Sequence, residues 1–166
     1  MIILGIDPDR GWALAVHPRP DKERIVAAGS VKGLDEMFEK IRELAVDPEL
    51  EIDEVRIEQP TSKKPYQREG QTVAAMKKIS VNVGENLAKG DAIYFYCLGL
   101  GLNAVRTAPI RGGTKLSAKQ VKLITGFSGR SNDHMRDAIM IAWMDGVRVN
   151  PKRRGRKKAA GRCANV

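Results

Sequence analysis

Short apolar runs, separated by turn-forming residues, fill the first thirty positions of the chain. We expect strands over residues 1–6, 12–16 and 24–30, which are short and rich in Ile, Val and Ala. Because their connections are short, these strands are expected to form an antiparallel meander. A further apolar run predicts a fourth strand over residues 55–58, parallel to the first because a helix links it back.

Apolar residues at helical spacing predict a helix over residues 34–44 with one buried face. A longer helix is expected over 72–99, with a break near Gly84 or Gly90. Within it, the apolar stretch 93–98 is equally consistent with a strand.

The remaining positions predict a strand over residues 103–108, a basic helix over 117–125 that Ser117 caps, and a final helix that Asn132 caps. The buried stripe of the final helix is expected to contain Met135, Ala138, Ile139, Ala142 and Trp143. This order of elements describes a mixed five-stranded α/β sheet with helices on both faces, the ribonuclease H-like arrangement.

The net charge of the chain suits either a solvated basic surface or a polyanionic partner, and its uneven distribution indicates the partner. The 166 residues carry a formal net charge of +9, with 29 Lys and Arg against 20 Asp and Glu. The length suits one domain, which we place at 1–149. Residues 150–166 contain seven Lys and Arg and no acid, which predicts a disordered basic tail that follows phosphates.

Other features favour a cytoplasmic protein that no membrane anchors. The two cysteines, Cys97 and Cys163, match no zinc spacing, which suits a reducing compartment. The first residues lack the basic segment of a signal peptide. No apolar stretch approaches the roughly 20 residues of a membrane span.

Four polar residues lie where their side chains can converge. Asp7 and Glu58 end predicted strands, and His134 and Asp137 lie three apart at the start of the last helix. Such a cluster can hold two divalent ions about 4 Å apart, the arrangement that activates water in phosphoryl transfer. On so basic a chain, the phosphate is expected to belong to nucleic acid.

Each residue also has a simpler interpretation. Asp7 is suited to accept a hydrogen bond within an Asx turn, and a Glu at a strand end is usually solvated. An acid near a helix N-terminus interacts favourably with the helix dipole, although this suits Asp133 better than Asp137. His134 and Asp137 adjoin the apolar stripe, where polar groups cost free energy unless they bind something.

Three segments resemble the acidic motifs of the RuvC family of Holliday junction resolvases: residues 4–8 (Leu-Gly-Ile-Asp-Pro), 57–60 (Ile-Glu-Gln-Pro) and 134–139 (His-Met-Arg-Asp-Ala-Ile). The resemblance implies a homodimer that makes paired symmetric nicks in four-way DNA during recombination and repair. It also implies two Mg²⁺ or Mn²⁺ ions in each site. Asp7, Glu58 and Asp137 would be metal ligands, and His134 a ligand or a residue that positions the attacking water, with Asp133 as a neighbouring substitute.

The chain also departs from the family pattern. Thr61 and Ser62 stand where members often carry an aromatic wedge, and the nearest aromatic residue is Tyr66. The basic tail is not a general feature of the bacterial members. These departures indicate a divergent branch, for which a phage source, and so a host cytoplasm, is one explanation.

Residues in one loop and around one helix, all of them basic except Tyr66, are the expected DNA contacts. They are Lys63, Lys64, Tyr66 and Arg68 in the loop, and Arg111, Lys115, Lys119 and Lys122 on the helix and its approach. Contacts of this kind fix position and carry no base information. The dimer interface is expected on the long helix, where Ile93, Tyr94, Phe95 and Leu98 gather.

Three alternatives compete with this hypothesis. One is another nuclease of the same fold, such as a ribonuclease H acting on hybrid duplex. Another is an ATPase of the actin and sugar-kinase type, but Asp9 and Arg10 form a poor phosphate turn and the chain is short for a second domain. The third is a basic DNA-binding module without catalytic activity.

Overall fold

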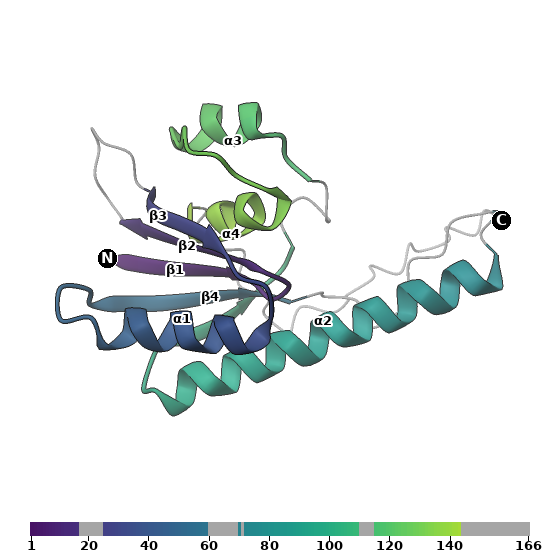
Figure 1. Ribbon diagram of the computed structural model, residues 1–166, viewed down its shortest axis with the longest axis horizontal. Coiled ribbons are helices and arrows are strands. Elements are labelled where there is room, and N and C mark those ends of the chain that lie inside the picture. The colour runs from purple at the N-terminus through teal and green to yellow at the C-terminus, as the bar shows by residue number, and fades with distance from the viewer. Residues whose placement is uncertain (17–24, 60–69, 71, 110–114, 144–166) are drawn as a thin grey trace, which may run out of the picture.

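A mixed five-stranded sheet forms the centre of the computed structural model, with helices on both of its faces (Figure 1). The structure describes residues 1–16, 25–59, 70, 72–109 and 115–143. The elements in chain order are β1 (Ile2–Asp7), β2 (Gly11–Val16), β3 (Ile25–Ser30), α1 (Leu34–Val46), β4 (Ile52–Glu58), α2 (Val73–Gly99), β5 (Ala104–Thr107), α3 (Ala118–Thr125) and α4 (Asp133–Trp143).

The strand pairing confirms the predicted meander. β1 pairs with β2 and β2 with β3, both antiparallel, while β4 lies parallel to β1 and β5 parallel to β4. The strand order is therefore β3-β2-β1-β4-β5. Because β1 and β4 are adjacent and parallel, their carboxyl ends reach the same edge of the sheet, and Ile6 pairs with Ile57 one residue before each strand ends.

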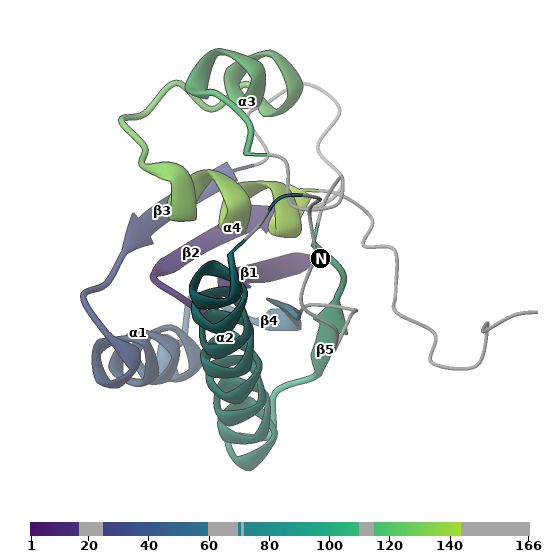
Figure 2. The same cartoon turned by 90° about the vertical axis from the view of Figure 1, so that its right-hand side faces the viewer.

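One face of the sheet packs against α1 and α2. Strand side chains alternate between faces, so Leu4 and Ile6 of β1 point to this side and are fully buried. The core here also contains Met37 and Ile41 of α1 and Ile93 of α2. Figure 2 shows α1 and α2 below the sheet and α4 above it.

The opposite face packs against α4, and α3 lies beyond that helix. Ile3 of β1 is fully buried here with Ala138 and Ile139 of α4. Ala142 of the expected stripe is also buried, whereas Met135 and Trp143 are partly exposed. The two capping predictions are confirmed: the Ser117 hydroxyl accepts from the Gln120 amide, and the Asn132 side chain accepts from the Met135 amide at 2.9 Å.

The long helix α2 has no break, so the predicted interruption at Gly84 or Gly90 is wrong. A glycine inside a helix costs about 1 kcal/mol relative to alanine, which packing elsewhere in 27 residues can offset. Residues 93–98 are helical, which settles the alternative of a strand. In Figure 1 the N-terminal half of α2 projects beyond the edge of the sheet where β1 and β4 end.

Several predictions fall on residues outside those that the structure describes. They concern the contacts at Lys63, Lys64, Tyr66, Arg68 and Arg111, and the tail over residues 150–166. Cys97 is buried in the core with a free thiol. Within the described residues, no helix is both long and apolar enough to cross a membrane.

Candidate active site

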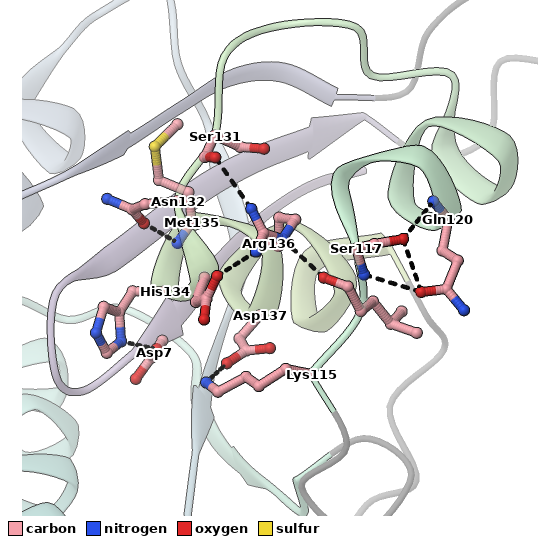
Figure 3. Close-up of polar contacts among 12 residues, drawn as sticks. Asp7, Lys115, Ser117, Gln120, Ser131, Asn132, His134, Met135, Arg136 and Asp137 are labelled. Carbon is pink, nitrogen blue, oxygen red and sulfur yellow. Dashed lines mark hydrogen bonds and ion pairs between the residues drawn. The ribbon is translucent and has the colours of Figure 1, made fainter.

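Asp7 is a buried carboxylate at the end of β1, with a relative exposure of 7%. Its Oδ1 accepts from the Asp9 amide at 3.0 Å, which is the Asx turn that the simpler interpretation predicted. Its Oδ2 lies 2.9 Å from His134 Nδ1 (Figure 3). Asp7 therefore both shapes the turn after β1 and contacts a second residue of the predicted site.

Two glycines let α4 approach the sheet closely enough for this contact. A Cβ on Gly5 would lie 2.4 Å from the Ala138 carbonyl oxygen, and one on Gly11 only 2.0 Å from that of His134. Neither position has space for any larger residue. The close approach carries the first two turns of α4, and with them His134 and Asp137, to the end of β1.

Glu58 ends β4 directly beside the end of β1. Burial, and after it the negative charges of Asp7 and Asp137, raise the pKa of its carboxyl group to about 7. The coupling places these three carboxylates within electrostatic reach of one another. Glu58 is thus not the solvated strand-end residue of the simpler interpretation.

Lys115 supplies positive charge to this acidic group. Its ammonium group forms an ion pair with Asp137 Oδ2 (Figure 3). Burial opposes the charged form of Lys115, but the hydrogen bond to Asp137 and the charges of Asp7 and Glu58 raise its pKa. Burial also raises the pKa of Asp137, which the lysine partly offsets. The predicted DNA contact Lys115 therefore lies inside the acidic site.

The donor set suits a hard divalent cation, because carboxylate oxygens are preferred by Mg²⁺ and Mn²⁺ and imidazole also binds Mn²⁺. Burial and then the repulsion from Asp7 and Asp137 raise the pKa of Glu58, and a bound cation would relieve that repulsion, which also favours a metal site. As the side chains stand, no three His, Cys, Asp or Glu residues of the described chain are grouped closely enough to hold one ion. The ammonium group of Lys115 provides the compensating charge in this arrangement.

Helix α2 holds the ends of both strands through contacts that the sequence did not indicate. Lys89 donates to Asp9 Oδ1 at 2.7 Å and so fixes the turn after β1. Although burial opposes it, the hydrogen bond and charge of Lys89 lower the pKa of Asp9. Asp91 accepts from Gln59 at 2.9 Å and from Arg106 at 2.7 Å, beside the end of β4. These pairs are 80, 32 and 15 residues apart, and no sequence spacing indicates them.

Two of the predicted DNA contacts, Lys119 and Lys122, are exposed on α3. Neither shares an ion pair with any other residue in the described part of the chain. Both remain predictions.

Replacing Glu58 with Gln is expected to stabilise the metal-free protein at pH 8. The folded protein holds the Glu58 proton up to about pH 7, whereas an ordinary Glu loses it near pH 4.5, so wild-type stability falls as pH rises between these values. The variant lacks this fall. Urea unfolding in EDTA should show a gain of about 2 kcal/mol at pH 8, allowing for solvent screening, and little difference at pH 4.5. The exposed Glu51→Gln serves as control, and equal pH slopes in all three proteins would contradict the coupling.

Comparisons of the chain with models of protein families, with curated proteins and with solved structures find no match. The functional assignment therefore rests on the residues of this chain.

Proposed function

We propose that the protein is a metal-dependent endonuclease that cuts four-way DNA junctions. The observation that supports this most is the grouping of Asp7, Glu58, His134 and Asp137 at one end of the sheet. Charge coupling relates the three carboxylates, and a 2.9 Å contact joins His134 to Asp7. The residues come from β1, β4 and α4, and the contact between Asp7 and His134 joins positions 127 residues apart in the chain.

The architecture supports the finer assignment to the ribonuclease H-like fold. An antiparallel β1-β2-β3 meander continued by the parallel strands β4 and β5, with α4 across the sheet, is the order that this assignment requires. The three acidic motifs that resemble the RuvC family fall at the end of β1, the end of β4 and the first turns of α4. A resolvase of that type is the function that best accounts for this placement.

Asp7, Glu58 and Asp137 would hold two Mg²⁺ or Mn²⁺ ions, with His134 as a further ligand or as the residue that orients water. When bound, such ions lower the pKa of a coordinated water and stabilise the charge on the leaving oxygen. His134 is oriented by Asp7 through Nδ1, which leaves Nε2 free to hold a proton. Lys115 would move from Asp137 to a phosphate oxygen when cations enter.

A single gel experiment tests the proposal and its alternatives. Labelled four-way junction, linear duplex of the same sequence and RNA–DNA hybrid are incubated with protein in Mg²⁺ and, separately, in EDTA. We expect paired cleavage of the junction alone, in Mg²⁺ alone. Preferred cleavage of the hybrid would support a ribonuclease H, whereas junction binding without any cleavage would support a non-catalytic DNA-binding module.

Two opposed nicks need two sites, so we infer that the protein acts as a two-fold dimer. Of the residues expected at the interface, Ile93 is fully buried in the core, and Tyr94 lies against Arg106 with the guanidinium 3.9 Å from its ring centre. Phe95 and Leu98 remain exposed, at 63% and 44%. The interface that we propose therefore contains Phe95 and Leu98, in the C-terminal turns of α2.

Phe95→Glu is expected to give a folded monomer that nicks a junction on one strand without paired cleavage. An exposed side chain can accept this charge without unfolding, whereas a dimer interface would bury it unpaired at a cost of several kcal/mol. Sedimentation should show the mass of one 18.3 kDa chain. Val81→Glu, at a similarly exposed position of α2, is the control. A dimeric Phe95→Glu protein with normal paired cleavage would exclude this interface.

A further inference from the structure

A cleft beside His134 is not used by the proposed chemistry. Its volume is about 630 Å³, and three segments line it: Arg10 in the turn after β1, residues 30–32 at the end of β3 and just after it, and residues 132–134 at the start of α4. A volume of this size lies within the roughly 300–1,000 Å³ typical of small-molecule sites. It is sufficient for a nucleotide.

Hydrogen bonds between distant parts of the chain hold the walls of this cleft together. The Val31 amide donates to the Arg10 carbonyl at 2.9 Å, which joins the turn after β1 to the segment after β3. The Asn132 amide group donates to the Ser30 hydroxyl at 3.1 Å, which joins that segment to α4. Because each wall is tied to the next, the cleft is formed before any ligand binds.

The lining of the cleft carries net positive charge. Arg10 and Lys32 are both exposed, and neither forms an ion pair with another residue in the described ranges. Asp133 is the acid among the lining residues, but it is paired with Arg136. Arg136 is held in place because it also donates to two carbonyl groups, those of Leu116 at 2.7 Å and Ser131 at 3.0 Å.

His134 connects this cationic cleft to the acidic site. It lines the cleft and also contacts Asp7, so the two regions share one residue. In Figure 3 the side chains of Asn132 and His134 lie at the start of α4. Asp137 lies further along that helix, and Lys115 reaches it from the segment before α3. A polyanionic strand with one phosphate at the acidic site can therefore continue past His134 into the cleft.

Building on the proposed nuclease function, we propose that this cleft binds the DNA strand being cut at the phosphate next to the scissile one, through Arg10 and Lys32. The Asn132 side chain is engaged at both polar atoms, by Met135 and Ser30, and the described residues that line the cleft include no Phe, Tyr or Trp. The His134 ring is oriented by its contact with Asp7, so the described lining offers no Phe, Tyr or Trp face for stacking and no unengaged amide for base-edge contacts. Recognition here is of the backbone and independent of sequence.

The test measures junction binding without cleavage. Fluorescence anisotropy of a labelled four-way junction in EDTA, over a series of NaCl concentrations, compares wild type with Arg10→Gln, Lys32→Gln and the double variant. The matched control is Arg42→Gln, which removes one exposed charge from α1, across the sheet from α4. Thermal unfolding of each protein verifies that it is folded.

The double variant is expected to bind about tenfold more weakly at physiological salt, with the slope of log K against log salt reduced by about 1, the contribution of one neutralised phosphate. The junction affinities of the two single variants should lie between those of wild type and the double variant. Arg42→Gln should change the affinity by less than about twofold, since salt screens the charge of the distant Arg42. If the double variant matches Arg42→Gln while wild type binds and cuts the junction, the cleft is not a subsite and the nuclease function stands. If wild type binds no DNA, both proposals are overturned.

Discussion

Asp7→Asn is expected to lower junction cleavage by more than about 100-fold, the scale on which a preorganised charge-stabilising group acts. The amide retains the oxygen that accepts from Asp9, so the turn after β1 should survive. What disappears is the negative charge beside Glu58 and His134. Junction binding should be unchanged or tighter because one repelling charge is lost. Single-turnover cleavage and binding assays measure the two effects separately.

Asp47→Asn provides a matched control for this substitution. Asp47 also accepts a backbone amide two residues ahead, from Glu49 at 2.9 Å, and lies at the end of α1 outside the acidic site. The same chemical change in the same local turn should leave cleavage intact. Divalent cations should raise the melting temperature of wild type and of Asp47→Asn. The rise should be much smaller in Asp7→Asn. Full activity in Asp7→Asn would exclude this residue as a metal ligand.

The positions of the strands were predictable because local patterns determine them. Short apolar runs and the turns between them place β1, β2 and β3 to within a residue or two, and the link through α1 predicts that β4 lies parallel to β1. Capping side chains likewise located the starts of α3 and α4. The break in α2 was predicted wrongly, because a local penalty at glycine says nothing of the packing along the rest of the helix.

The residues of the candidate site were identified from strand ends and helix spacing, but apart from the Asx turn at Asp7 their contacts were not predictable. The placement of Lys115 against Asp137 depends on how α3 and its approach pass over α4, which no local pattern encodes. The cleft at Arg10 and Lys32 needs three segments to meet, two of them joined by a hydrogen bond across 102 residues. Sequence spacing predicts which side chains share an element, whereas these contacts depend on how elements pack together.

Gly11→Ala is expected to lower the free energy of unfolding by about 3 kcal/mol or more, at the upper end of the cost of overpacking. The added Cβ would lie 2.0 Å from the His134 carbonyl oxygen and 2.5 Å from its carbonyl carbon. Both atoms belong to the backbone, so no side-chain rotation can relieve the clash, and α4 must move away from β2. That movement would separate His134 from Asp7, and cleavage should fall even where the protein remains folded. Urea unfolding and cleavage below the unfolding transition measure both effects.

Gly84→Ala separates this steric effect from the general effect of replacing a glycine. Nothing lies within 4 Å of a Cβ at Gly84, which is inside α2, so alanine should stabilise the protein by about 0.5–1 kcal/mol through helix propensity alone. The same substitution thus has opposite signs at the two positions. Gly5→Ala, whose Cβ would lie 2.4 Å from the Ala138 carbonyl oxygen, should resemble Gly11→Ala. If Gly11→Ala and Gly5→Ala were as stable as wild type, α4 would not pack this closely against the sheet. The contact between Asp7 and His134 would then lose its structural basis.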